Sequence, residues 1–241
     1  MNHKTSGSSI PLRLTAPHPC SYLPNQIAST AFVDPAYQIT PFLFSRLAEV
    51  GFRRSGEYLY RPQCEHCQAC SPIRIPVQAF HPTRNQKRCL KRNEYLHVRA
   101  LDDINTTHCY ELYARYLSTR HHDGDMYPPT REQYENFLCH HWPGTFYLGF
   151  YDAQETLLGI SVCDRFTHGL SAVYTFYEPT ESARSLGVYA VLTQIVHARW
   201  LQLPYLYLGY WIRDCRKMAY KTQYTPYELL HDGVWQTATP E

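Results

Sequence analysis

Features of exported and membrane proteins are missing from this sequence. No apolar run approaches the length of a membrane span, and residues 1–9 are polar where a secretory signal would be apolar. Disulfides are not expected either, because nine cysteines without a signal are typical of reduced thiols in a cytosolic enzyme. We therefore expect a cytoplasmic protein with no membrane partner.

Net charge is also small. The 241 residues carry a formal charge of only +2, so any nucleic-acid site has to be a local patch. Apolar residues make up 44% and charged residues 18%, which is the balance of a folded protein and excludes a disordered one. Tyrosine is abundant instead, at 21 copies, and its apolar ring and polar tip suit surfaces that both stack and hydrogen-bond.

Acidic residues are absent between positions 66 and 93, where basic residues gather. Five of these follow the i, i+3, i+4, i+7 spacing of one helix face, namely Arg84, Lys87, Arg88, Lys91 and Arg92. Five like charges on one stripe repel one another, and no acid nearby offsets them. We therefore predict a face that binds phosphates, with a solvated helix surface as the alternative.

Three cysteines, Cys64, Cys67 and Cys70, form a Cys-x2-Cys-x2-Cys run among polar residues. This spacing brings thiolates onto one centre, as zinc sites and iron–sulfur clusters require, and buried free thiols are the alternative. A closed site needs a fourth ligand, for which the candidates are Cys20, Cys89 and His66. We predict a quartet with Cys20, which lies in a proline-flanked loop, because Cys89 follows two basic residues on the expected helix.

The order of expected elements predicts two domains and an α+β fold. Residues 10–103 would form a small cysteine-cluster and phosphate-binding domain, with a helix over 41–50 whose apolar side is Phe42, Phe44, Leu47 and Val50. Residues 104–241 would form the second domain. There, helices over 105–118 and 130–138 precede an antiparallel meander, a helix, a strand and a basic helix, over 145–151, 157–166, 170–177, 185–200, 205–212 and 216–220.

This order is that of the acyl-CoA N-acyltransferase (GNAT-like) fold, whose sheet is mainly antiparallel. In that fold an R-x-x-G-x-G/A loop after the meander holds a pyrophosphate. Here Arg184 and Gly187 fit the pattern, but Tyr189 stands where the second small residue belongs. A tyrosine there would obstruct the approach of a phosphate, which indicates a donor other than coenzyme A.

Several motifs in order resemble the bacterial aspartate/glutamate leucyltransferases, relatives of the eukaryotic arginyl-tRNA–protein transferases. Besides the cysteine segment 60–74, they are Pro-Cys-Ser-Tyr-Leu-Pro at 19–24, Met-Tyr-Pro-Pro at 126–129, Tyr-Thr-Phe-Tyr-Glu-Pro at 174–179, Ser-Leu-Gly at 185–187, Tyr-Leu-Gly-Tyr-Trp-Ile at 207–212 and Cys-Arg-Lys-Met-Ala-Tyr-Lys at 215–221. The resemblance covers roughly residues 10–235.

The resemblance implies transfer of leucine from leucyl-tRNA to proteins that begin with Asp or Glu. It also implies that residues 10–103 contact the tRNA and that the basic face of Arg84, Lys87, Arg88, Lys91 and Arg92 binds tRNA phosphates. The product would be marked for N-end-rule degradation by a downstream N-degron adaptor and protease. The eukaryotic relatives carry an iron–sulfur cluster in the N-terminal domain, for which Cys20 and Cys70 are the matching positions, whereas Cys64 and Cys67 resemble the bacterial branch.

The chemistry of such a transfer makes modest demands. The ester of an aminoacyl-tRNA is already activated, and an α-amine with a pKa of about 7.7–8.0 is the nucleophile. Positioning and stabilisation of the oxyanion should therefore matter more than a strong base. No cofactor is required for this step, so a zinc or iron–sulfur centre at the quartet would be structural.

Candidate site residues follow from these demands. Asp164 or Glu178, at the ends of expected strands, could accept the ammonium proton, with a salt bridge or strand-end capping equally possible. The acidic acceptor needs a cation, for which the candidates are Arg184, Arg213, Lys217 and Lys221. Tyrosines could stack on the terminal adenine or donate to the oxyanion, or equally pack in the core: we assign Tyr174, Tyr177 and Tyr207 to tRNA and Tyr210 to catalysis.

Other function classes stay open at this point. A cysteine-cluster nucleic-acid-binding module would explain only the first half, and a coenzyme-A-dependent N-acetyltransferase only the second. The sequence does not separate leucine from arginine as the donated residue, so an arginyl-tRNA–protein transferase remains an alternative.

Overall fold

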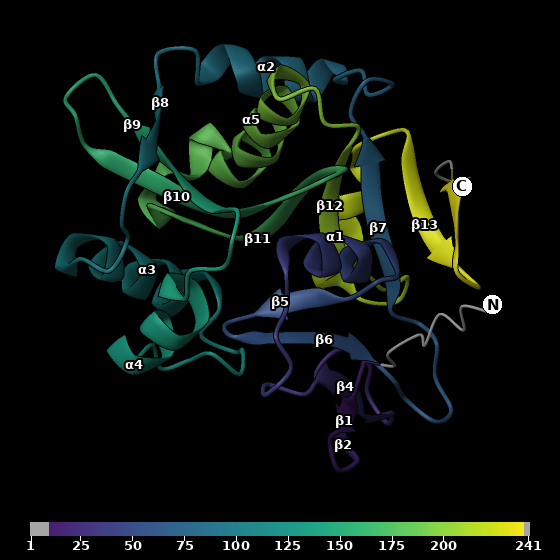
Figure 1. Cartoon of the computed structure of the whole chain (residues 1–241). Helices are drawn as coiled ribbons and strands as arrows, with labels where there is room; N and C mark the ends of the chain where they lie inside the picture. Colours follow the sequence, from purple (N-terminus) through teal and green to yellow (C-terminus); the bar gives the residue numbers. More distant parts are fainter. Residues whose placement is uncertain (1–9, 239–241) are drawn as a thin grey trace.

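A small sheet and a hairpin form the first part of the chain in the computed structural model, which describes residues 10–238 (Figure 1). The small sheet is antiparallel and has the order β1, β4, β6, β5, with bounds Leu12–Leu14, Thr30–Val33, Tyr58–Pro62 and Arg53–Ser55. A two-stranded hairpin, β2 (His18–Pro19) and β3 (Ile27–Ala28), holds the loop that carries Cys20.

An eight-stranded sheet forms the body of the molecule. Its order is β14, β13, β7, β12, β11, β10, β9, β8, with bounds Val234–Ala238, Tyr227–His231, Ser71–Pro76, Tyr205–Trp211, Gly169–Tyr177, Leu157–Phe166, Thr145–Tyr151 and His97–Leu101. Every neighbouring pair is antiparallel except β11 and β12. The expected α+β class with a mainly antiparallel sheet is confirmed. The sheet takes β7 and β8 from before position 103, so both sides of the expected boundary share it.

The meander β9–β10–β11 forms where the three β-type runs predict it. Its first gap closes as a tight turn because the carboxylate of Asp152 accepts hydrogen bonds from the backbone of Gln154 at 2.9 Å and Thr156 at 2.8 Å. The next strand, β12, pairs with β11 only over Gly169–Ser171. Beyond that point the two strands separate, which opens the centre of the sheet.

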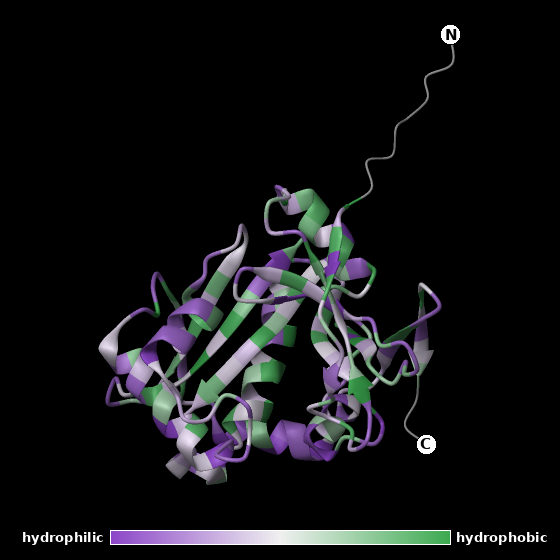
Figure 2. Ribbon diagram, turned by 90° about the horizontal axis from the view of Figure 1, so that it is seen from below, coloured by the Kyte–Doolittle hydropathy of each residue, from purple (hydrophilic) through white to green (hydrophobic). Residues whose placement is uncertain are grey.

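Helices cover both faces of the large sheet. α2 (Arg84–Arg92) and α5 (Leu186–Trp200) pack on one face. On the other lie α3 (Thr107–Arg120), α4 (Arg131–Tyr134) with the π-helical turn η1 (Glu135–Cys139), and α1 (Pro41–Glu49). Two 3-10 helices, η2 (Pro179–Arg184) and η3 (Arg216–Gln223), flank α5 and β12. Figure 2 shows hydrophobic residues along the central strands and hydrophilic ones on outer helices and loops.

The apolar face of α1 differs from the expected one. Phe44 and Leu47 are buried, but Phe42 is 70% exposed and Val50 lies beyond the helix end. Two residues span about 200° of an α-helix, so Phe42 points away from the face that carries Phe44. No helix among residues 10–238 is long and apolar enough to cross a membrane.

Candidate active site

A cavity of about 960 Å³ opens where β11 and β12 separate. One wall is β11 from Ala172 to Tyr177, and another is the first turn of α5. The remaining walls are the end of α3 with the following loop, the segment from Leu208 through η3, and Ser21 with Tyr22 of the N-terminal hairpin loop. Phe137 of η1 also lines the cavity, so six segments of the chain meet at one hollow.

Apolar and tyrosine side chains make up much of the lining. The apolar members are Leu117, Met126, Phe137, Val173, Val188, Val191 and Leu208. The rings of Tyr116 and Tyr177 lie 4.8 Å apart, and Tyr174 packs against Phe137 at 5.3 Å. Burial, together with neighbouring tyrosines, raises the pKa of Tyr116 and Tyr174 above the usual value. Both hydroxyls therefore stay protonated at neutral pH and can donate hydrogen bonds.

Polar groups lie on the side of the loop after α3. The imidazole Nε2 of His121 is 3.1 Å from the hydroxyl of Tyr116. Burial, and then the charge of Lys217, lowers the pKa of His121, so the ring is neutral at pH 7. Asp123 accepts a hydrogen bond from Lys217 at 2.9 Å and ties this loop to η3 across the cavity. His121 was not among the site residues predicted from the sequence, although the Met-Tyr-Pro-Pro motif at 126–129 lies close to it in the chain.

The basic helix α2 lies across one rim of the cavity. The side chain of Gln86 donates to the carbonyl of Gln223 at 3.0 Å, and that of Asn93 donates to the carbonyl of Arg184 at 2.8 Å. The helix thus connects the end of η3 to the turn before α5. Thr83 and Gln86 form a capping box at its start, which explains why the helix begins there.

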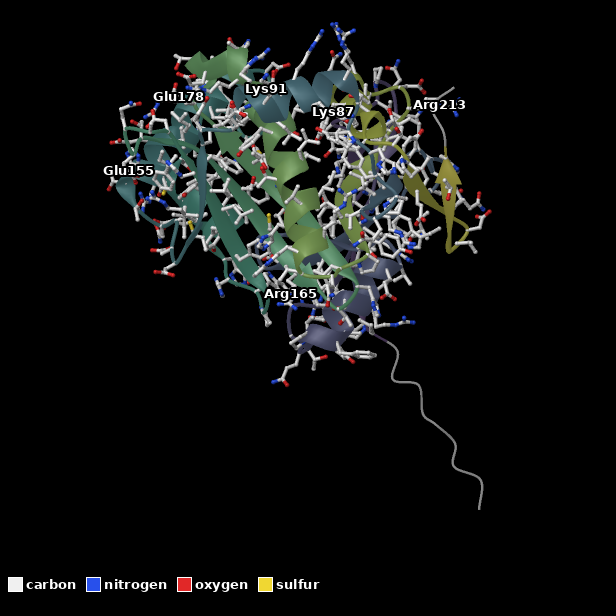
Figure 3. All side chains as sticks on the ribbon, turned by 90° about the horizontal axis from the view of Figure 1, so that it is seen from above. Lys87, Lys91, Glu155, Arg165, Glu178 and Arg213 are labelled. Carbon is white, nitrogen blue, oxygen red and sulfur yellow. The ribbon has the colours of Figure 1, made fainter. Side chains whose placement is uncertain are left out.

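The five basic residues of α2 all have exposed side chains. None forms an ion pair with another residue of the described chain, and Arg92 also donates to the carbonyl of Ala183. Figure 3 labels Lys87 and Lys91 on α2, with Glu178 beyond one end and Arg213 beyond the other. The expected basic helix is confirmed as a structural element, and its role toward tRNA stays a prediction.

Asp164 lies in the interior and outside the cavity lining. Its carboxylate accepts hydrogen bonds from Arg54 Nε at 2.8 Å, Arg54 Nη2 at 3.1 Å and Thr145 Oγ1 at 2.7 Å. Both members of the ion pair are 1% exposed in their side chains. This environment supports a structural role for Asp164.

Glu178 lies next to the cavity residue Tyr177, at the end of β11. Burial would raise its pKa, but hydrogen bonds from Thr180 and Arg115 outweigh burial and lower it below the usual value. The carboxylate of Glu178 is therefore ionised at neutral pH, and it caps η2 while it pairs with Arg115 at 3.0 Å.

The four expected tyrosines divide between two environments. Tyr174 and Tyr177 line the cavity. Tyr207 is buried against Phe166 and Trp235, and the hydroxyl of Tyr210 donates to the carbonyl of Gly51 at 2.6 Å. Side chains alternate along a strand, so Tyr207 and Leu208 are expected to point to opposite faces of the sheet. The alternation does not predict which of the two faces the cavity.

The four expected acceptor cations also differ. Arg184 is paired with Glu181 at 2.6 Å and Lys217 with Asp123. Arg213 is exposed and outside the cavity lining. Lys221 lines the cavity, where its Nζ donates to the carbonyl of Tyr210 at 2.5 Å.

Tyr189 does not obstruct the turn before α5, contrary to the expectation. Its ring is buried in the core, 5.6 Å from that of Phe150, because this position of α5 faces the sheet. Ser185 and Gly187 face the cavity instead, and a Cβ at position 187 would lie 3.3 Å from the ring of Tyr177. The position of Tyr189 therefore does not exclude coenzyme A as the donor.

The four cysteines of the predicted quartet gather near the cavity. Burial raises the pKa of Cys70 to about 12, and the neighbouring thiols of Cys64, Cys20, Cys67 and Cys215 add to the shift. Each thiolate makes the ionisation of the neighbouring thiols less favourable, and a bound cation would reverse this effect. The donor set suits zinc or an iron–sulfur cluster, yet within residues 10–238 no three potential ligands have an arrangement that could hold a metal.

The alternative fourth ligands have other contacts. Cys89 is buried on α2 beside the carbonyl of Ser185, at 3.6 Å, and His66 is exposed beside Glu65. Cys215 lines the cavity together with Ser21 and Tyr22, which follow Cys20 directly. The cysteine group and the cavity therefore share one wall.

Similar proteins identify the family to which this chain belongs. The family models described as "Arginine-tRNA-protein transferase, C terminus" and "N terminus" match residues 108–231 and 18–88. The aspartate/glutamate leucyltransferase of Saccharophagus degradans is 49% identical over 97% of this chain and 99% of its own length. That of Teredinibacter turnerae is 52% identical over 96% and 95%.

Solved structures are similar only at a distance. The C-terminal domain of a putative lysylphosphatidylglycerol synthetase from Agrobacterium fabrum matches with 13% identity and a TM-score of 0.46, over 83% of this chain and 64% of that one. L-PGS from Bacillus licheniformis matches with 10% identity and a TM-score of 0.47, over 71% and 59%. This chain spans less than two thirds of either. The two family models and the near-complete, half-identical relatives establish that the chain belongs to the arginine-tRNA-protein transferase family, together with the aspartate/glutamate leucyltransferases.

Proposed function

We propose that this protein is an aminoacyltransferase that moves leucine from leucyl-tRNA to proteins whose first residue is Asp or Glu. The observation that carries the proposal is the near-complete match, at about half identical residues, to proteins named aspartate/glutamate leucyltransferase. The setting is the cytoplasm, and the leucylated product passes to an N-degron adaptor and protease.

The cavity and α2 support a donor that is a charged tRNA. The outward stripe of α2 offers five cations to the phosphates, and the helix crosses the cavity rim through Gln86 and Asn93. A tRNA backbone on this stripe brings its 3′ end to the hollow between β11 and β12. There Tyr174 and Tyr177 offer ring faces for the terminal adenine.

The transfer itself is an aminolysis. The neutral α-amine of the acceptor attacks the ester carbonyl, the bond to the ribose oxygen breaks, and one amine proton ends on that oxygen. The protonated hydroxyls of Tyr116 and Tyr174 are available to the oxyanion, and the neutral imidazole of His121 can relay the proton. In this scheme Asp164, Glu178 and Tyr210 position other groups, through Arg54, Arg115 and the Tyr210 carbonyl that holds Lys221.

Leucine fits this lining better than arginine does. Seven aliphatic or other apolar side chains line the cavity, whereas a donated arginine would need a free acid. Of the three acids in the lining, Asp123 is paired with Lys217, and Asp125 and Asp214 are exposed to solvent rather than buried in the hollow. An arginyl donor is the second candidate, because the matching family models describe arginine-tRNA transfer.

A donor competition separates these candidates and the two other function classes. The purified protein is given labelled leucyl-tRNA, arginyl-tRNA or acetyl-coenzyme A with an Asp-initiated peptide, and label on the peptide is measured. We expect label from leucyl-tRNA alone. Label from acetyl-coenzyme A would instead identify an N-acetyltransferase with a GNAT-like fold, and tRNA binding without transfer would identify a nucleic-acid-binding module.

We further propose that Cys20, Cys64, Cys67 and Cys70 hold a structural zinc ion or iron–sulfur cluster. The support is their common influence on Cys70 and the choice of thiolate ligands. In protein purified without oxygen, Cys20→Ser should lower both the metal content and the melting temperature. Cys109→Ser, at a buried thiol of α3, is the control. Unchanged metal content in Cys20→Ser contradicts the quartet.

A further inference from the structure

The buried Arg53 and the half-buried Lys221 lie beside the cavity, and no acid among residues 10–238 forms an ion pair with either. Arg53 is 5% exposed, and its guanidinium donates through Nη1 to the carbonyls of Ala48 at 3.0 Å and Phe52 at 2.7 Å. Its Nε and Nη2 are buried and have no hydrogen-bond partner in the described part of the chain. Neighbouring Arg54, by contrast, has Asp164 as its counter-ion. Buried charges are normally paired, so Arg53 requires an explanation.

Aromatic rings surround Arg53 where a carboxylate would be expected. The guanidinium carbon lies 5.1 Å from the ring centre of Tyr207 and 5.8 Å from that of Tyr210. Cation–π contacts partly compensate a positive charge but do not neutralise it. The region around β5 and β12 therefore keeps a net positive charge in the interior.

Lys221 is the second cation of this pair and the one that reaches the cavity. It has no ion pair with any acid among residues 10–238. Burial, and then the charge of Arg53, lowers the pKa of Lys221 to about 8. Gly209, with φ of +79°, stands where β12 bulges against β7. A Cβ there would lie 3.8 Å from the Nζ of Lys221, so the glycine leaves room around the ammonium.

The other basic residues of the cavity lining, Arg216 and Lys217, differ from Lys221, because Arg216 is exposed to solvent and Lys217 has an acidic partner. Lys217 belongs to the same 3-10 helix, η3, and it is paired with Asp123. Arg184, at the rim, is paired with Glu181. A negatively charged ligand would have to break these pairs, whereas at Lys221 it would supply a missing partner.

We propose that Lys221 binds the side-chain carboxylate of the acceptor's N-terminal Asp or Glu, with Arg53 as a positioning residue whose charge strengthens the attraction. The inference rests on the proposed leucine transfer and adds the basis of acceptor selection. An acceptor that begins with Asn or Gln has nearly the same shape but leaves both cations without a partner, so it is discriminated against by charge rather than by size.

The test compares Asp- and Asn-initiated peptides that are otherwise identical. For Lys221→Met, kcat/KM with the Asp peptide should fall about 30-fold or more, as when one partner of a desolvated charge pair is removed. With the Asn peptide it should change little, so the preference for Asp collapses. Lys221→Arg should restore most of the preference, and leucyl-tRNA binding should stay unchanged in both variants.

Lys217→Met is the matched control, because it removes a cation from the same helix and the same cavity. It should keep the ratio of Asp to Asn activity. If the Lys221→Met enzyme keeps this ratio, the inference is overturned. An equal loss of activity with both peptides is one such result, and it would mean that Lys221 acts on the oxyanion or on a tRNA phosphate instead. Failure of the proposed function looks different, since the unmodified protein would then transfer no leucine to either peptide.

Discussion

At the scale of single residues, Asp164 shows how an environment decides a role. Three hydrogen bonds from Arg54 and Thr145 hold its carboxylate in the interior. Asp164→Asn removes the negative charge and leaves the guanidinium of Arg54 buried without compensation. We expect the free energy of unfolding to fall by about 3–5 kcal/mol. Urea denaturation measures this; full stability combined with lost leucine transfer would show that Asp164 acts in the chemistry instead.

Lys221 gives a pH-dependent prediction at the same scale. Its pKa of about 8 means that it is charged below pH 8 and loses its charge as the pH rises through that value. The groups that act on it are Arg53 of β5, Cys215 before η3, and the carbonyl of Tyr210 on β12. Carboxylate binding is therefore complete at lower pH and lost above pH 8.

The pH profile of kcat/KM with an Asp-initiated peptide should accordingly fall above pH about 8, after an initial rise as the acceptor amine deprotonates. Lys221→Arg keeps its charge at all these pH values, so the falling limb should disappear. An identical falling limb in both proteins would assign it to another group.

At the scale of elements, α2 carries the most direct prediction. Removing two charges with Lys87→Ala and Lys91→Ala should weaken leucyl-tRNA binding and flatten its salt dependence by about two phosphate contacts. Arg46→Ala with Arg165→Ala removes the same charge at exposed positions of α1 and β10, and should leave the salt dependence unchanged. Filter binding over a salt series measures both, and an unaltered slope in the α2 variant would reduce the stripe to a solvated surface.

Elements with strong local patterns were predictable from the sequence. The meander follows from its strand runs, and α5 and α2 follow from helical spacing. Of the small sheet only β6 was expected, as a strand over 58–60, and β8, β13 and β14 were not predicted. In β1, β8 and β14 most side chains are exposed, so these short strands lack an apolar pattern. The central place of β7 depends on pairing with β12 and β13, more than 100 residues away, which no local signal contains.

At the scale of the whole molecule, the cavity exists because six segments of the chain meet where β11 and β12 separate. Lys221, Tyr174 and Tyr177 could be chosen from the sequence because the chemistry requires a cation and ring faces. Tyr207 and Tyr210 were chosen by the same reasoning, but they lie in the core, since residue type does not determine which face of a strand meets the hollow. Arg53 could not be chosen from the sequence, because what distinguishes it is the lack of a counter-ion among the described residues around it, which only the fold determines.

Leucine transfer to acidic N-termini is the central claim, and one assay tests it most directly. The protein is incubated with radiolabelled leucyl-tRNA and peptides that differ only in a first residue of Asp, Glu, Lys or Arg. We predict label on the Asp and Glu peptides and none on the others. Label on the Lys and Arg peptides alone would contradict the account.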